Sequence, residues 1–275
     1  MGEKPFAWLG SMFGMDDPSQ VLPQIKRYVE DGRLEISEVM SLELVAKLQA
    51  QKKRELDAQS WLVDAARIAA DVLEKRNKFP RALAAAMTLV KERTALRKML
   101  AASDADAVAA LDTQAAEDFV QAGRIAAQCG KLSKAIKLAN KANKTVPKHL
   151  GAAIICAHSH ALAKKDMRGA SKPVIKLVKR LKHAGPVIRN GGAFLLQPEG
   201  QPATDLNWLL TCIDYWLNQE MNLADKPATA LTAVAVDYRA QIAAIEAGEQ
   251  VANARLQAAV DKLNPSEDYH AYSRN

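Results

Sequence analysis

Apolar residues recur every three or four positions along most of this chain, and the alternating pattern of strands is nearly absent. The run Trp61, Ala65, Ile68, Ala69 and Val72 has this spacing, which puts all five side chains on one face of a helix. Ala is abundant, and aromatic residues make up only 5% of the 275 residues. Because Ala is the strongest helix former and aromatic residues favour strands, the pattern predicts an all-α fold of closely packed helices.

The periodicity also gives approximate positions for the helices. We expect helices from about residue 37, from about residue 60, from 79 to 99, as a series of hairpins over 114–183, and at 205–219 and 227–263. The stretch 101–113 is small and acidic and predicts a linker. Stacked antiparallel helical hairpins with a long C-terminal helix are therefore the expected architecture.

Gly and Pro set the predicted boundaries. Residues 183–203 contain Gly185-Pro186, Gly191-Gly192 and three further Gly or Pro residues, which predicts a break in the helical pattern. The expected segments are a lead segment 1–33 that carries an apolar cluster, a hairpin region 34–184, a loop 185–204, and C-terminal helices with a polar tail over 205–275.

One window has the packing pattern of a specific helix–turn–helix. It places small residues where two helices touch, Gly at the turn and Pro at the end: Ala116, Phe119 at the large position, Gly123, Gly130, Ala135, Ala142 and Pro147. The window, about 116–149, resembles a tetratricopeptide repeat, and weaker windows begin at about residues 63 and 151. The resemblance implies a first helix at about 116–129, a second at about 132–144, and protein partners.

The resemblance also implies a ligand groove. The first helix of each such hairpin lines a concave surface, so its outward positions are the candidate groove residues. They are Val120, Arg124, Ala127 and Gln128 in the first window, and Ile155, Ser159 and Leu162 in the next.

Positive charge is concentrated in the middle of the chain. Residues 119–190 contain sixteen Lys or Arg and one acidic residue, Asp166, for a net charge of +15, whereas the whole chain carries +7. The segments on either side therefore carry −2 and −6. A solvated helix usually mixes both signs for support between positions i and i+4, so this block predicts a surface that meets an anion. A solvated face that serves solubility is the alternative.

The lysines of this block fall on helical stripes. Lys134, Lys137, Lys141 and Lys144 step by three, four and three, which puts them opposite the apolar side of the second helix. The candidate anion-binding or partner-binding residues are Lys131, Lys134, Lys137, Lys141, Lys144, Lys148, Lys172, Lys176, Lys179 and Arg180.

Several anions fit such a ridge. An acidic protein surface fits, and so does the acidic C-terminal part of this chain or of a second copy, which makes a homo-oligomer plausible. An anionic membrane surface fits the same stripes. Nucleic acid also fits, with little sequence specificity, because Lys outnumbers Arg and Phe119 is the only aromatic residue in 119–190.

No pattern of catalytic or metal-binding residues emerges. Cys156 and His160 share a helix face but His158 does not, and zinc needs three or four convergent ligands. Phosphate-binding glycine loops and nucleophile motifs are absent from the sequence. We therefore expect a non-catalytic adaptor or scaffold with no catalytic residue, metal, cofactor or small-molecule substrate.

The cysteines and the apolar runs bear on the compartment. Cys129, Cys156 and Cys212 are odd in number and widely spaced, which argues against a disulfide framework. Apolar runs stay well below the roughly 18 residues that span a bilayer. The sequence thus favours a cytoplasmic protein.

A separate apolar cluster lies near the beginning of the sequence. Five large apolar residues occur within eight positions, ahead of two aspartates: Phe6, Trp8, Leu9, Met12 and Phe13. Two interpretations stay open. The cluster packs back on the protein's own core, or it anchors the chain in a partner's groove or at a membrane interface.

Overall fold

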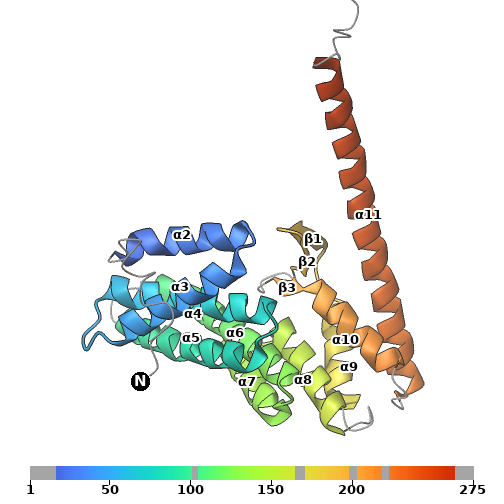
Figure 1. Cartoon of the computed structure of the whole chain (residues 1–275). Helices are drawn as coiled ribbons and strands as arrows, with labels where there is room; N and C mark the ends of the chain where they lie inside the picture. The colour runs from blue at the N-terminus through green and yellow to red at the C-terminus, as the bar shows by residue number, and fades with distance from the viewer. Residues whose placement is uncertain (1–16, 101–104, 165–170, 198–202, 219–222, 264–275) are drawn as a thin grey trace, which may run out of the picture. The chain divides into compact units, whose positions relative to one another are not determined.

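The computed structural model describes residues 17–100, 105–164, 171–197, 203–218 and 223–263 (Figure 1). Most of these residues are helical, which confirms the predicted all-α class. The chain divides into two compact units, Met1–Leu177 and Val178–Asn275. The first unit ends a few residues before the break that Gly and Pro predict, and the segment 185–204 falls inside the second unit.

The first unit is a series of helical hairpins. Its helices are α2 (Pro18–Glu30), α3 (Leu34–Gln49), α4 (Leu56–Lys75), α5 (Phe79–Leu100), α6 (Ala105–Gln128), α7 (Leu132–Thr145) and α8 (Leu150–Lys164). Helices joined by short turns pack side by side, and each hairpin packs on the next through α3 and α4, α5 and α6, and α7 and α8 (Figure 1). The predicted stack of antiparallel hairpins is therefore confirmed.

Small residues explain how closely these helices pack. Ala66, Ala69 and Ala86 are fully buried on α4 and α5, where their methyl groups leave room for the neighbouring helix. Leucines such as Leu62 and Leu89 fill the remaining space and are also fully buried. This alternation of small and large side chains is the pattern on which the helical prediction rests.

The α6–α7 turn shows how the sequence ends one helix and begins the next. Gly130 has a φ of +71°, in the left-handed region that favours glycine. Its N–H donates to Ala127 O at 2.9 Å, and the N–H of Lys131 donates to Ala126 O at 2.8 Å. These two bonds satisfy carbonyls at the end of α6, as in a Schellman motif. Helix α7 then ends at Thr145, two residues before Pro147, which cannot continue a helix.

The linker predicted at 101–113 is wrong over most of its length. Helix α6 already begins at Ala105, while residues 101–104 lie outside the described part. Four alanines between residues 105 and 110 favour the helix, and Asp106 in the first turn suits the positive end of the helix dipole. Asp112 also pairs with Arg97 of α5. The acidic composition thus belongs to a helix start rather than to a loop.

The second unit contains a small sheet that the sequence prediction missed. Helix α9 (Ser171–Leu181) crosses the division and is followed by strands β1 (Val187–Asn190), β2 (Ala193–Leu196) and β3 (Thr204–Asp205). Strands β1 and β2 pair antiparallel, with Asn190 opposite Ala193. Gly191 and Gly192 between them have φ of +52° and +88°, which suits a type I′ hairpin turn. The sequence Asn190-Gly191-Gly192 between apolar residues carried this signal, so the predicted loop 185–204 needs this correction.

Two helices complete the second unit, as expected. Helix α10 (Leu206–Asn218) begins where Asp205 Oδ1 accepts the N–H of Asn207 at 2.9 Å. It buries Trp216 completely. Helix α11 (Asp225–Leu263) buries Leu231, Ala235 and Tyr238, whereas residues 250–262 are all exposed. Within this unit the far half of α11 extends beyond α10 and the strands (Figure 1).

Candidate functional site

Helix α7 presents lysines on one side and its packing residues on the other. Ala135, Leu138, Ala139 and Ala142 are buried, because α7 packs on both α6 and α8. Lys134, Lys137, Lys141 and Lys144, which we call the lysine row, occupy the opposite side; Lys134 is half-buried and the other three are exposed. Ten residues separate the ends of the row, so it is about 15 Å long.

The lysine row has no carboxylate neighbours in the described part of the chain. Neither the four lysines of the row nor Lys131 forms an ion pair there. The ammonium group of Lys141 lies 5.7 Å from the centre of the Phe119 ring, a cation–π contact that covers this aromatic face. The charge of the row is therefore left for solvent or for a ligand.

Other basic side chains of the first unit form ion pairs between helices. Eight of them reach a carboxylate on a neighbouring helix: Arg54 pairs with Glu92, Arg67 and Arg93 with Asp118, Arg76, Lys78 and Arg81 with Glu38, Arg97 with Asp112, and Arg124 with Glu74. Glu38, Glu74, Glu92, Asp112 and Asp118 thus help to hold neighbouring helices together. The lysine row differs from these paired side chains in that its four members share one helix face and have no carboxylate partner among the described residues.

The remaining basic candidates lie at the ends of α7 and on α9. Lys131 precedes α7, Lys148 follows it, and both are exposed. Lys172, Lys176 and Lys179 are exposed on α9, with Arg180 half-buried beside them. Ile175, 43% exposed, interrupts this second stripe with an apolar side chain. Helix α9 crosses the division between the two units.

The predicted groove is wrong for three of its residues. Val120 is 8% exposed, and Ile155 and Ser159 are fully buried, so these side chains cannot line an open surface. Val120 and Ile155 lie in a close contact between α6 and α8: a Cβ on Gly151 would come within 2.8 Å of Val120 Cγ1, and one on Gly123 within 3.0 Å of Ile155 Cδ1. The small glycines that suggest a repeat therefore bury the very residues assigned to the groove.

The other groove candidates, Arg124, Ala127, Gln128 and Leu162, differ from one another in burial and contacts. Arg124 donates to both carboxylate oxygens of Glu74, at 2.8 and 2.9 Å, and so ties α6 to α4. Ala127 is buried, Gln128 is exposed and Leu162 is half-buried. Together these positions do not form a common surface.

A polar ladder between α4 and α6 was missed by the sequence analysis. Its three rungs are Arg67 with Asp118, Asp71 with Gln121, and Glu74 with Arg124. The α4 members follow a spacing of four and three, and the α6 members a spacing of three and three, so each set lies on one helix face. These spacings were visible in the sequence, but their partners are about fifty residues away. Two rungs are ion pairs and the third is a hydrogen bond, so the ladder is a structural seam between α4 and α6.

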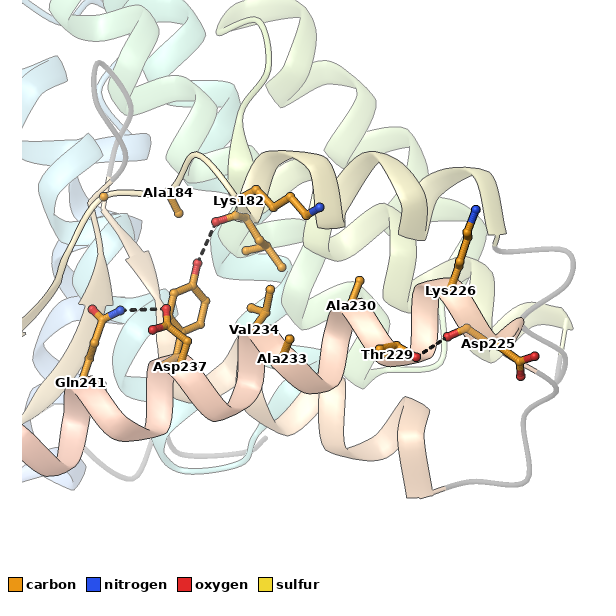
Figure 2. Close-up of a pocket in the computed structure, with 13 residues that line it drawn as sticks. Lys182, Ala184, Asp225, Lys226, Thr229, Ala230, Ala233, Val234, Asp237 and Gln241 are labelled. Atoms are coloured by element: carbon orange, nitrogen blue, oxygen red, sulfur yellow. Dashed lines mark hydrogen bonds between the residues drawn. The ribbon is translucent and has the colours of Figure 1, made fainter.

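A groove of about 620 Å³ lies in the second unit, between the chain that follows α9 and the beginning of α11 (Figure 2). Its floor is apolar, with Leu181, Ala230, Ala233, Val234 and Tyr238. The hydroxyl of Tyr238 donates to Leu181 O at 3.1 Å, and burial raises the pKa of Tyr238 to about 12, so it stays a neutral donor. The volume is typical of ligand pockets.

The rim of this groove does not select a charge. Lys182 and Lys226 are balanced by Asp225 and Asp237. Gln241 donates to Asp237 at 3.0 Å (Figure 2). It also accepts the N–H of Val187 at 3.2 Å, so its amide joins α11 to β1. A neutral rim and an Ala-lined floor indicate no particular ligand class.

The Cys156, His158 and His160 cluster does not form a metal site in the structure. Cys156 Sγ lies 4.0 Å from Asn140 Oδ1, and burial lowers the pKa of His158. Among the described residues, no three His, Cys, Asp or Glu side chains converge as metal ligands would. No described helix is both long enough and apolar enough to cross a bilayer.

Comparisons with known proteins assign no family. Neither the family models nor the curated proteins give a match to this chain. Among solved structures, BtubC (BKLC) from P. vanneervenii is similar at 15% identity over 97% of this chain and 89% of that chain, with a TM-score of 0.43. YrrB, a TPR protein with an unusual peptide-binding site, aligns at 14% identity over 64% of this chain and 92% of that chain, with a TM-score of 0.25. Both scores are too low for either structure to assign a function here.

Proposed function

We propose that this protein is a non-catalytic adaptor that uses the lysine row of α7 to hold an acidic surface of a protein partner. The observation that carries this proposal is the contrast in pairing within the first unit. Most of its described arginines reach carboxylates on neighbouring helices, whereas the lysine row has no carboxylate partner among the described residues.

The spacing of the row favours a peptide or helix as the acidic element. Like charges at positions i, i+3 and i+4 repel one another on the surface of a helix. Carboxylates that recur at the same spacing on a partner helix meet these ammonium groups one by one. Binding then relieves repulsion as well as forming new pairs, and the affinity is expected to fall as salt screens the charges.

The resemblance of residues 116–149 to a tetratricopeptide repeat supports a protein partner by analogy. A catalytic role is not part of the proposal, because the buried carboxylates in the described chain are engaged. Glu38 is held by three basic side chains, Asp118 by two, and Glu92 by Arg54 and Gln59.

Nucleic acid is the second candidate, since the same lysines can contact phosphates. The cation–π contact of Lys141 on Phe119 weighs against it, because single-stranded nucleic acid is commonly bound by aromatic faces that are open for stacking. Protein is therefore the favoured partner class.

The test is binding of the full chain to three defined probes across a salt series. The probes are a fluorescent ten-residue glutamate peptide, a mixed-sequence single-stranded RNA, and vesicles with one-third phosphatidylserine. Preferred binding of the peptide, weakened by salt, supports the proposal. Preferred binding of RNA or of vesicles contradicts it, and so does indifference to all three. Light scattering on the same samples shows whether a second copy of the chain is the partner.

A further inference from the structure

The groove of the second unit has one wall that is still open to solvent (Figure 2). Helix α11 forms this wall, where Ala233 and Asp237 are exposed and Ala230 and Val234 are half-buried. The wall therefore keeps apolar surface whose burial by a further helix would be favourable. A groove of about 620 Å³ has room for several side chains of such a helix.

The far half of α11 offers apolar surface that is also uncovered. Residues 250–262 are all exposed, and Val251 and Leu256 keep 52% and 65% of their surface open. Most of the other apolar residues of this half are alanines, which let a second helix approach closely. The same helix thus contains both an open groove wall and an exposed stretch that a groove would cover.

One face of α11 has the same spacing in both halves of the helix. From Ala230 to Ala244 this face steps by three, four, four and three residues, and from Gly248 to Lys262 it takes the same steps. Steps of three and four keep all these positions on one side of a helix. Because the pattern is symmetric about residue 246, the face matches a second copy of itself that runs in the opposite direction.

This register places complementary residues opposite each other. Asp237 lies nine residues before residue 246, and Arg255 lies nine residues after it, so each carboxylate faces the guanidinium of the other copy. Arg255 has no carboxylate partner among the described residues. Ala244 faces Gly248 where the two helices cross, and a Cβ on Gly248 would meet nothing within 4 Å, so the backbones have room to approach there.

The groove cannot be filled by the far half of its own helix. Helix α11 is continuous from Asp225 to Leu263. Ala233 in the groove and Arg255 in the exposed half are 22 residues apart, which corresponds to about 33 Å along the axis. The matching surfaces therefore meet only between two molecules.

We propose that two copies of this chain pair through antiparallel α11 helices, with the exposed half of each helix in the groove of the other. The two-fold axis passes at the level of residue 246, and each contact occurs twice. Such a symmetric interface closes on itself and gives a dimer rather than a filament. The interface uses no residue of the first unit, so it is independent of the lysine row.

The test reverses the charges of the predicted ion pair in the full chain. Asp237→Arg and Arg255→Asp each place like charges opposite one another at two points of the dimer, and the double variant restores opposite charges. Glu246→Arg is the matched control, because it makes the same change in charge as Asp237→Arg at an exposed position on the opposite face of α11. Sedimentation velocity over a concentration series gives the Kd of the dimer, and circular dichroism compares the helix content of the variants.

The proposal predicts a dimer for the wild type and for Glu246→Arg. Each single reversal at 237 or 255 is expected to raise Kd by about tenfold or more, and the double variant to return it to within about threefold of the wild type. A wild type that stays monomeric over the whole series overturns the proposal. A dimer that tolerates both single reversals overturns it too, as does a double variant that stays as weak as the single ones. Lys137→Gln combined with Lys141→Gln should leave Kd unchanged, and loss of the dimer in that variant would place the contact on α7 instead.

Discussion

The carboxylates of Glu38 and Asp71 in the first unit have pKa values shifted in opposite directions. Glu38 is 3% exposed, and burial acts to raise its pKa. The hydrogen bond and charge of Lys78, together with the charges of Arg81 and Arg76, outweigh burial and hold the pKa of Glu38 below its ordinary value of 4.5. Burial raises the pKa of Asp71, where the hydrogen bond from Gln121 only partly compensates. The first carboxylate thus stabilises the fold when ionised, whereas ionisation of the second carries a cost.

Replacement of the first carboxylate is expected to be strongly destabilising. Glu38→Gln leaves Arg76, Lys78 and Arg81 together without their shared anion. We expect the free energy of unfolding in urea at pH 7 to fall by about 3–5 kcal/mol. The difference from the wild type should shrink as the pH falls from 4.5 through the lowered pKa of Glu38, because the carboxyl becomes protonated first in the unfolded chain and then in the folded chain. Glu35→Gln is the matched control, since Glu35 pairs with Arg76 from an exposed position and should matter little. A loss of less than about 1 kcal/mol in Glu38→Gln would show that the cluster does not hold α3 in place.

Replacement of the second carboxylate is expected to have the opposite sign. Asp71→Asn keeps an oxygen that accepts from Gln121 but removes the buried charge. Stability at pH 7 should be unchanged or higher, and the advantage should disappear as the pH falls through 3.8, where the wild-type carboxyl is neutral in both the folded and the unfolded chain. Urea titrations at pH 7 and at about pH 3 measure this difference. A marked loss of stability at pH 7 would mean that the charge of Asp71 is needed by Arg67 or Arg124.

At the scale of helices, two glycines lie in opposite surroundings: one in a close helix–helix contact and one on an open surface. A Cβ on Gly151 of α8 would lie 2.8 Å from Val120 Cγ1, whereas one on Gly248 of α11 meets nothing within 4 Å. Gly151→Val is therefore expected to separate α8 from α6 and to cost about 1–3 kcal/mol in the free energy of unfolding. Thermal unfolding followed by circular dichroism measures it. An unchanged melting temperature would show that the α6–α8 contact is looser than the structure indicates.

Gly248→Ala tests the exposed half of α11. Because Ala fixes helical backbone at a lower entropic cost and no neighbour is disturbed, helicity should rise, by an amount that corresponds to about 0.5–1 kcal/mol locally. Hydrogen exchange of the amides near residue 248 should slow in this variant. Exchange near Leu231 should not change, because that part of α11 is held by packing. Equal slowing in both places would contradict this division of α11.

The same elements show what the sequence can predict. Helix α5 was predicted with its bounds nearly correct, because its apolar spacing and Pro80 are local signals. The β1–β2 hairpin was missed although Asn190-Gly191 marks its turn, since the prevailing helical pattern obscured four-residue strands. The groove residues Val120 and Ile155 were misplaced for another reason. Whether an outward position is open depends on the next hairpin, which approaches as closely as Gly123 and Gly151 allow.

At the scale of the whole molecule, charged residues that pair between helices and the basic block occupy different parts of the sequence. In the first unit, acidic and basic side chains pair across helices as far as α6. The basic block then begins, and among the described residues α7 and α8 contain no acidic residue. The sequence alone reveals this block, because its charge is a matter of composition. The pairing of the remaining arginines could not be predicted, since their partners are as many as fifty residues away.

The most direct test of the adaptor proposal compares two variants that each lose four positive charges, one from the lysine row and one from elsewhere in the first unit. The row variant combines Lys134→Gln, Lys137→Gln, Lys141→Gln and Lys144→Gln. The control combines Lys52→Gln, Lys53→Gln, Lys75→Gln and Lys98→Gln, which are exposed in the same unit. Fluorescence anisotropy of the ten-residue glutamate peptide gives Kd for both variants and for the wild type at low salt. We predict a loss of affinity of about tenfold or more in the row variant and less than about threefold in the control. Equal losses in the two variants would mean that only net charge matters, and would contradict a binding site on α7.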